Sequence, residues 1–278
     1  MSTLAIALAA CSPLDLLNAL TPSGTYRNIP SASYGPGPRQ RMDIYLPHAG
    51  TSPAALAPMV VFFYGGSWQH GSRSDYRFVG EALASRGIVV VVPDYRLYPQ
   101  VRYPDFLADS AAAVAWAYRR AAEFGADPRR VFVMGHSAGA YNAAMLALDP
   151  RWLGAAGLSP SCLAGWLGLA GPYDFLPIVD PDVRPVFFHP DYPTGTQPID
   201  HVSAASIPAF IAAAASDTVV DPQRNTRQLA QKLTEAGVAV RLRLYPHLSH
   251  ATLVGALSRP LRWLAPVLDD VTDFIRGE

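Results

Sequence analysis

The chain has 278 residues, of which 50% are hydrophobic and 16% charged, and this composition suits one large α/β domain with a sizeable core. Lys+Arg and Asp+Glu both number 22 and no basic stripe stands out, so we do not expect a nucleic-acid partner. The two cysteines, Cys11 and Cys162, are too few for a disulfide framework and lack metal-ligand spacing, so no metal is expected.

A short apolar run opens the chain, from Leu4 to Ala10, and Cys11 follows it. The segment 8–11 (LAAC) resembles the bacterial lipobox, which implies cleavage before Cys11 and a lipid on its sulfur. The protein would then be an envelope lipoprotein tethered to a membrane. Residues 1–10 contain no Lys or Arg, so the basic region typical of a signal peptide is missing. The alternatives are a true start further upstream, or a cytoplasmic protein with an apolar helix and a buried Cys11.

Apolar runs alternate with helical patterns along most of the chain. Residues 41–46 alternate and predict an early antiparallel strand. The runs 58–64 and 87–92 are continuously apolar, which indicates strands buried on both faces of a parallel sheet. Further strands are predicted at 131–134, 166–170, 209–215 and 238–245, and helices at 76–86, 104–124, 140–148, 229–236, 251–257 and 261–275. Such alternation is typical of a doubly wound α/β sheet, here mostly parallel.

A Pro-rich insert near 172–206 interrupts this pattern. Its prolines recur too often for long helices or strands. The insert follows a strand that ends near Gly171, so we expect it to overhang the carboxyl edge of the sheet as a cap or pocket wall. An inert surface loop is the alternative. The candidate pocket aromatics, for which core packing is the alternative, are Trp68, Phe187, Phe188 and Tyr192.

The central predicted strand runs directly into Gly135-His136-Ser137-Ala138-Gly139, a G-x-S-x-G motif that a predicted helix follows. A strand, a tight turn with serine at its apex and a helix are the context of a nucleophile elbow. Gly135 and Gly139 leave room for strand and helix to approach each other. The turn would lift Ser137 Oγ clear of the sheet, and the N–H of Ala138 would meet negative charge at a helix N-terminus.

A serine nucleophile requires a base, and the base requires an acid. In the fold of this elbow, both follow the serine in the order acid, then histidine. Asp217 lies just past the apolar run 209–215. Asp221 is followed by Pro222 and suits a helix N-cap, so Asp217 is the favoured acid and Asp221 the alternative.

The base must follow that acid, and beyond residue 217 only His247 and His250 remain. His250 directly precedes a predicted helix, whereas His247 lies nearer the end of the last strand and suits a solvated loop. His250 is therefore the favoured base. Chain order excludes the other histidines as the base: His48, His70, His136, His189 and His201.

A loop for the oxyanion is predicted at 64–68 (YGGSW), where a strand ends and two glycines let the backbone approach a substrate closely. A simple glycine turn is the alternative. The combined motifs resemble those of α/β-hydrolase carboxylesterases of the hormone-sensitive-lipase and bacterial feruloyl-esterase-like branch. The matching segments are YGGSW (64–68), PDYRL (93–97), AEFGADP (122–128), GHSAG (135–139), GPYDF (171–175), DTVV (217–220) and LSH (248–250).

The resemblance covers nearly everything from Tyr34 onward and implies an α/β-hydrolase catalytic domain at 34–278, after a lead-in at 1–33. It implies Ser137, Asp217 and His250 as a catalytic triad. It also implies that Gly66, Ser67 and Ala138 donate N–H groups to the oxyanion, and that Asp94 and Arg96 are scaffold. Three departures stand out: Tyr64 replaces the family histidine, Ala213 and Ala214 replace His-Gly before the acid, and His247 replaces a glycine.

The expected activity is that of a serine carboxylesterase acting on a small ester, with short-chain acyl or small aryl groups, through an acyl-enzyme. No metal or organic cofactor is implied. An arylformamidase that cleaves an N-formyl amide is the nearest alternative, because its loops resemble the same motifs. A binding protein without catalysis ranks last, because Ser137, Asp217 and His250 are all present.

Overall fold

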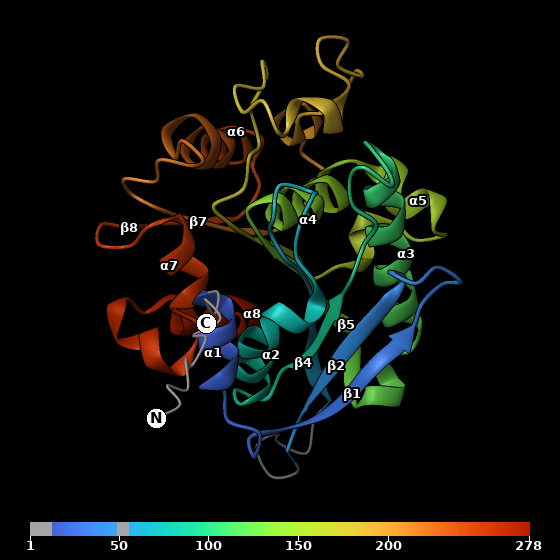
Figure 1. The fold of residues 1–278 in the computed structure, drawn as a ribbon, viewed down its shortest axis with the longest axis vertical. Coiled ribbons are helices and arrows are strands. Elements are labelled where there is room, and N and C mark those ends of the chain that lie inside the picture. Colours follow the sequence, from blue (N-terminus) through green and yellow to red (C-terminus); the bar gives the residue numbers. More distant parts are fainter. Residues whose placement is uncertain (1–12, 49–55) are drawn as a thin grey trace, which may run out of the picture.

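The computed structural model describes residues 13–48 and 56–278, so the lipobox at Cys11 lies outside the described residues. The strands form one sheet in the order β1-β2-β4-β3-β5-β6-β7-β8 (Figure 1). Their bounds are β1 Tyr26–Ser33, β2 Arg41–Pro47, β3 Ala57–Phe63, β4 Val89–Pro93, β5 Ala126–His136, β6 Gly165–Leu169, β7 Ala209–Ala214 and β8 Val240–Tyr245. The strand β2 pairs antiparallel with β1 and β4, and all later pairings are parallel. The predicted mostly parallel sheet is confirmed.

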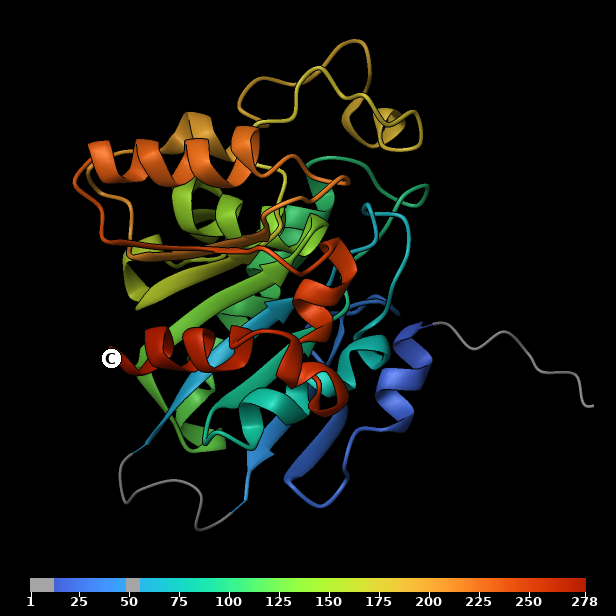
Figure 2. The ribbon, with the colours of Figure 1, turned by 90° about the vertical axis from the view of Figure 1, so that its left-hand side faces the viewer.

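Helices cover both faces of this sheet. Their bounds are α1 Pro13–Ala19, α2 Arg77–Ala84, α3 Asp105–Arg119, α4 Ala138–Leu148, α5 Pro150–Ala155, α6 Gln228–Glu235, α7 His250–Gly255 and α8 Val267–Arg276. The helices α2 and α8 contact each other on one face, with α1 beside α2, while α3, α4 and α5 pack together on the opposite face (Figure 2). This two-sided cover explains why the central strands are apolar without alternation.

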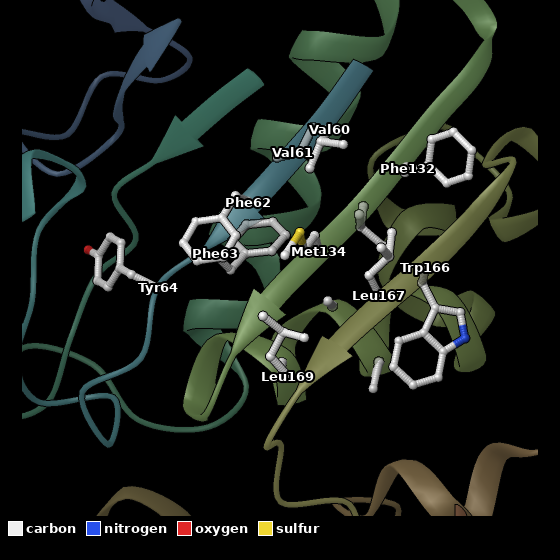
Figure 3. Packing of buried hydrophobic residues seen from close by; sticks show 14 of the residues in the cluster. Val60, Val61, Phe62, Phe63, Tyr64, Phe132, Met134, Trp166, Leu167 and Leu169 are labelled. Atoms are coloured by element: carbon white, nitrogen blue, oxygen red, sulfur yellow. The ribbon is translucent and has the colours of Figure 1, made fainter. Parts of the chain in front are cut away.

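The core is centred on β3 and β5, the middle strands of the sheet. Every residue of β3 is buried. From Met59 to Phe63 the two strands pair continuously, so that Val61 lies opposite Val133 and Phe63 opposite Gly135. Figure 3 shows Val61 and Phe63 among the buried side chains of this core. Because parallel strands end at the same edge, the residues after β3, β5, β6 and β7 arrive together at the carboxyl edge of the sheet.

Residues 13–33 of the N-terminal lead-in contain two regular elements, α1 and β1, that the sequence patterns do not predict. The strand β1 lies at the edge of the sheet and most of its residues are exposed. Its register with β2 shifts between Ile29 and Ala32, where Ser31 has a φ of 56°. An exposed edge strand with a bulge and a proline has no clear apolar alternation, which is why sequence patterns miss it.

Two predicted helices are shorter in the structure than in the sequence pattern. The helix at 104–124 ends at Arg119, and a separate 3₁₀ turn covers Ala121–Phe124 before Gly125 closes it with a φ of 75°. The helix at 261–275 is divided into a 3₁₀ segment, Arg259–Leu264, and α8. The break lies at Pro266. Proline has no backbone N–H, so it cannot donate the hydrogen bond that a continuous helix needs.

The insert at 172–206 contains no α-helix or strand, as its prolines predict. Its regular parts are 3₁₀ turns at Arg184–Phe187 and Pro198–His201. The insert begins directly after β6 and overhangs the sheet beside α6 (Figure 2). Gln197 holds its first part in place, because its side-chain oxygen accepts hydrogen bonds from the N–H groups of Phe175 and Leu176.

Candidate active site

Ser137 lies at a sharp turn between β5 and α4, as the motif predicts. Its backbone has a φ of 55° and a ψ of −123°, a strained conformation for a residue with a side chain. Strained backbone of this kind is often found at functional sites. The backbone N–H of Ser137 donates to the Leu169 carbonyl (2.9 Å) and fixes the turn to β6. A Cβ atom at Gly135 would lie 2.1 Å from the Gly139 carbonyl oxygen, so the close crossing of strand and helix requires glycine.

Asp217 and His250 form a hydrogen-bonded pair beyond the carboxyl ends of β7 and β8. His250 Nδ1 lies 2.8 Å from Asp217 Oδ2, while Asp217 Oδ1 accepts from the N–H groups of Val219 (2.9 Å) and Val220 (3.1 Å). Burial raises the pKa of Asp217, but the hydrogen bond and charge of His250 and the backbone N–H groups of Val220 and Val219 together lower that pKa below its ordinary value. A carboxylate can only accept, so Nδ1 carries the proton and Nε2 of a neutral His250 is free to take one.

The alternatives to this pair have other surroundings. Asp221 is exposed, and its Oδ1 accepts from the N–H groups of Gln223 (2.8 Å) and Arg224 (3.3 Å), as a helix-capping aspartate does. His247 is exposed in the loop after β8. The structure therefore pairs Asp217 with His250 and leaves both alternatives outside the pair.

His250 stands beside the serine turn. The ring of His136, the residue before Ser137, lies 4.9 Å from the ring of His250 between centroids. Within residues 13–48 and 56–278, no hydrogen bond joins Ser137 Oγ to His250. Such bonds are often long without substrate and shorten when it binds.

The loop after β3 lies directly against this turn. A Cβ atom at Gly65 would come within 2.9 Å of Ser137 Cβ. Gly66, Ser67 and Trp68 have φ values of 123°, 55° and 58°, so the chain reverses tightly. In the part of the chain that the structure describes, the N–H groups of Gly66, Ser67 and Ala138 donate to no protein acceptor. They are therefore free to bind an anion.

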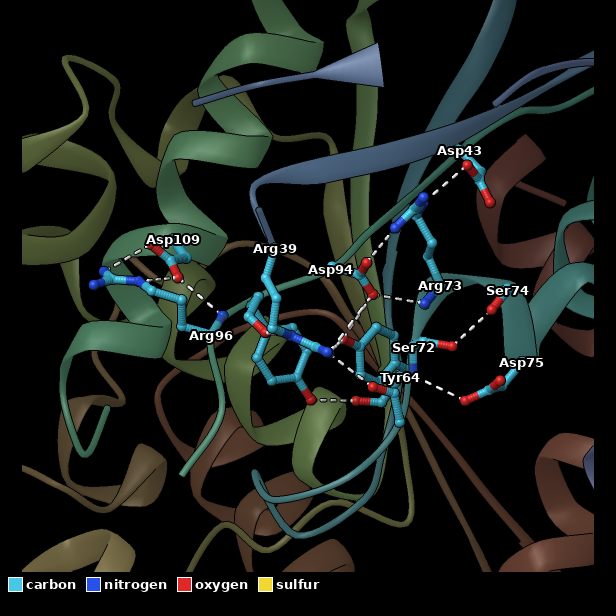
Figure 4. Close-up of polar contacts among 12 residues, drawn as sticks. Arg39, Asp43, Tyr64, Ser72, Arg73, Ser74, Asp75, Asp94, Arg96 and Asp109 are labelled. Carbon is cyan, nitrogen blue, oxygen red and sulfur yellow. Dashed lines mark hydrogen bonds and ion pairs between the residues drawn. The ribbon is translucent and has the colours of Figure 1, made fainter. Parts of the chain in front are cut away.

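Tyr64 anchors the start of this loop in place of the family histidine. Its hydroxyl accepts from Arg39 Nη2 (2.7 Å) and donates to Asp94 Oδ1 (3.0 Å), while its carbonyl accepts from the Tyr95 hydroxyl (2.7 Å; Figure 4). Burial, and then the charge of Asp94, raise the pKa of Tyr64 well above its ordinary value, so the hydroxyl remains a donor. Arg39 also donates to the carbonyl of Gly71 at the far end of the loop (2.7 Å).

The predicted scaffold residues make further contacts around this anchor. Asp94 also accepts from the backbone N–H of Arg73 (2.7 Å) and pairs with its guanidinium. Arg96 binds Asp109 through both Nε (2.8 Å) and Nη2 (2.9 Å), which fixes the loop after β4 to α3. The carboxylates of Asp94 and Asp109 are buried, so each is paired with a cation as a buried charge requires.

A pocket of about 360 Å³ opens in front of Ser137. Ser67, Trp68 and Ala138 form its floor with Ser137, and the insert and the loop after Asp217 form its walls. The insert thus contributes several lining residues to this pocket. The wall residues that sequence analysis did not identify include Phe175, Ile178, Val183, Val219 and Val220. Val219 and Val220, which follow the predicted acid after Thr218, were an available signal, because that loop had to face the same edge.

Of the predicted pocket aromatics, only Trp68 lines this pocket. Phe187 is fully buried behind Trp68, with ring centroids 4.9 Å apart, and belongs to the core. Phe188 faces Arg102, whose guanidinium carbon lies 5.2 Å from the ring centroid. The hydroxyl of Tyr192 accepts from the backbone N–H of Ile178 (3.1 Å) and so connects two parts of the insert.

Residues 13–48 and 56–278 contain no group of three or more His, Cys, Asp or Glu side chains placed to hold a metal ion. They also contain no helix that is both long and apolar enough to cross a bilayer.

Comparisons with known proteins agree with this fold. The BD-FAE family model matches residues 42–152. Two solved structures superpose on this one with a TM-score of 0.73. Esterase 2 of Thermogutta terrifontis is 23% identical, and the match covers 91% of this chain and 95% of that one. A truncated carbohydrate esterase from gut microbiota is 18% identical, and the match covers 92% of this chain and 98% of that one. At these identities the likeness concerns the fold, which is that of the α/β-hydrolases.

Sequence relatives extend the likeness. The chain is 30% identical to isoprenylcysteine alpha-carbonyl methylesterase ICME of Arabidopsis thaliana and 29% identical to the probable methylesterase ICMEL1 of that plant, over 89% of its own length in both cases. It spans 62% and 56% of those proteins. Carboxylesterase NlhH of Mycobacterium tuberculosis is 34% identical over 73% of this chain and 69% of the relative. With that identity over more than two thirds of an established carboxylesterase, the chain belongs to the α/β-hydrolase family of carboxylesterases.

Proposed function

We propose that the protein hydrolyses carboxylic esters through an acyl-enzyme intermediate on Ser137. The observation that carries this proposal is the convergence, at one edge of the sheet, of a strained serine turn, an Asp217–His250 pair and unpaired backbone N–H groups. Membership of a carboxylesterase family supports the same reaction. The names of NlhH and of the plant methylesterases describe ester hydrolysis in each case.

In this mechanism His250 Nε2 takes the proton from Ser137 Oγ as the oxygen attacks the ester carbonyl carbon. The N–H groups of Gly66, Ser67 and Ala138 stabilise the oxyanion, and each such donor is worth about 3 kcal/mol in the transition state. The carbon–oxygen bond to the alcohol breaks, and the alcohol leaves with the proton from His250. Water then gives a proton to His250 and attacks the acyl carbon. The bond between that carbon and Ser137 Oγ breaks, His250 returns the proton to Oγ, and the acid leaves. Asp217 stabilises the imidazolium in both steps.

The pocket favours small esters. Its volume of about 360 Å³ lies near the lower end for ligand pockets, and apolar side chains such as Phe175, Ile178 and Val183 form much of its wall. We therefore propose short-chain acyl or small aryl esters as substrates. Measuring kcat/KM for p-nitrophenyl acetate, butyrate and octanoate tests this proposal. A steady rise of kcat/KM up to octanoate would contradict it.

The alternative function is an arylformamidase. Faster cleavage of an N-formyl aryl amide than of any ester would favour that assignment over the esterase.

The mechanism is tested by Ser137→Ala and Asp217→Asn. We expect kcat on p-nitrophenyl acetate to fall by about 10⁴-fold or more in each, as in other triads. Ser161→Ala and Asp269→Asn, which change exposed side chains outside the site, are the matched controls and should retain activity. A fluorophosphonate probe should label the wild type but not Ser137→Ala. Full activity of Ser137→Ala would refute the mechanism, and loss of activity in Asp221→Asn but not in Asp217→Asn would reassign the acid.

A further inference from the structure

His136 is a buried histidine that the proposed mechanism does not use. It ends β5 and directly precedes Ser137, and only 5% of its surface is exposed. Its Nε2 lies 3.0 Å from the backbone carbonyl oxygen of His250. Because a carbonyl can only accept, Nε2 must carry the hydrogen and donate it. A single hydrogen bond therefore connects the serine turn to the backbone of the proposed base, across 114 positions of sequence.

The other ring nitrogen of His136, Nδ1, is buried. Among residues 13–48 and 56–278 it has no hydrogen-bond partner, although a buried polar atom without a partner is destabilising. Burial, and then the nearby His250, lower the pKa of His136 to about 3, so the ring is neutral near pH 7. A phenylalanine or leucine would fill the same space without an unpaired nitrogen. The bond from Nε2 to His250 is the one contact that an apolar side chain could not supply.

The surroundings of His136 place it between the parts of the proposed site. A Cβ atom at Gly65 would lie 3.3 Å from His136 Nδ1 and 2.9 Å from Ser137 Cβ, so the oxyanion loop packs on both residues. On its other side, His136 contacts the first residue of α7, His250, whose ring centroid is 4.9 Å away. The ring of His136 therefore fills the space between the oxyanion loop and the proposed base.

We propose that His136 is a positioning residue, whose Nε2–H holds the His250 backbone and thereby fixes the imidazole of His250 relative to Ser137. This inference rests on the proposed serine mechanism. The backbone of His250 is otherwise held at the N-terminus of α7, where Ser249 caps the helix. Without the bond from His136, α7 could shift against the serine turn. Displacing a catalytic group by about 1 Å can lower the rate by about 10²-fold.

The matched test compares His136→Gln with His136→Met. The amide nitrogen of glutamine lies as many bonds from Cβ as Nε2 does in histidine, so it can donate to the same carbonyl. Methionine has a similar length but no donor. We expect kcat on p-nitrophenyl acetate to fall about ten- to a hundredfold in His136→Met with little change in KM. His136→Gln should stay close to the wild type. Thermal unfolding of both variants serves as the folding control.

Equal kcat values for the two folded variants would overturn the proposal, because loss of packing alone would affect both. A second measurement needs no variant. In the wild type with ¹⁵N-labelled histidine, NMR should show His136 as the Nε2–H tautomer, unchanged down to pH 5. An Nδ1–H tautomer would also refute the proposal. Probe labelling that is lost in Ser137→Ala supports the serine mechanism independently, so positioning by His136 can fail while the esterase assignment stands.

Discussion

Burial of His136 as a neutral ring makes the free energy of unfolding depend on pH. Its pKa is about 3 in the folded protein, against an ordinary value of 6.5 that applies to the unfolded chain. As pH falls below 6.5, the imidazole of residue 136 therefore binds a proton in the unfolded chain but stays unprotonated in the folded protein. The stability contributed by the neutral ring is complete above pH 6.5, and it is lost progressively as pH falls toward 3.

The size of this loss follows from the difference between the two pKa values. One unit of pKa corresponds to about 1.4 kcal/mol, so the whole effect approaches about 5 kcal/mol at pH 3. Between pH 7 and pH 5 the unfolding free energy should fall by about 2 kcal/mol from His136 alone. Other titrating groups contribute as well, among them Asp217, whose pKa is also lowered. A variant that removes only the titration of residue 136 separates the contribution of His136 from that of the other groups.

His136→Gln is that variant, because it cannot titrate and can keep the hydrogen bond to His250. Urea unfolding at pH 7, 6 and 5 gives the free energy of each protein, and the difference between the two proteins cancels the groups that they share. We expect the wild type to lose about 2 kcal/mol more than His136→Gln between pH 7 and pH 5. Parallel curves would mean that His136 titrates normally in the folded protein, and they would refute the reasoning from burial.

Two further variants test buried polar contacts by their unfolding free energies. Tyr64→Phe removes a hydroxyl that accepts from Arg39 and donates to Asp94, so urea unfolding should show a loss of about 1–3 kcal/mol; no loss would mean that the network compensates fully. Glu81→Gln removes a buried charge that binds two guanidinium groups near the C-terminus, and we expect a loss of about 3 kcal/mol. The control is Glu123→Gln, which removes one partner of an exposed ion pair and should change the unfolding free energy by less than about 1 kcal/mol. An equal loss in Glu81→Gln and Glu123→Gln would contradict the role of burial.

The order of the proposed catalytic residues could be predicted from sequence because the topology imposes it. Parallel strands deliver their following loops to one edge, so Ser137, Asp217 and His250 had to come after strands in that order. The Asp217–His250 hydrogen bond agrees with this choice. The role of His136 could not be found in the same way. Chain order only excludes it as a base, and its contact with His250 depends on how α7 docks against the end of β5.

Pocket residues were harder to predict than the proposed catalytic residues. Phe187 and Phe188 are adjacent aromatic residues in the insert, but one is buried in the core and the other faces Arg102. An irregular segment has no period of 2 or 3.6 residues, so its sequence cannot show which side chain points inward. The position of Trp68 was predictable because it follows the oxyanion loop, whose location the end of β3 determines.

The tyrosine at position 64 shows how a family loop can keep its shape after losing a characteristic residue. The sequence shows that Tyr64 stands in place of the family histidine, but it does not show which residues hold the loop around it. In the structure, Arg39 reaches both Tyr64 and the carbonyl of Gly71, so one guanidinium holds both ends of the loop. Asp94 and Tyr95 supply the remaining partners from the end of β4. The proposed oxyanion donors, the N–H groups of Gly66 and Ser67, would need to be oriented before the substrate binds, and this network holds their loop with a tyrosine at position 64.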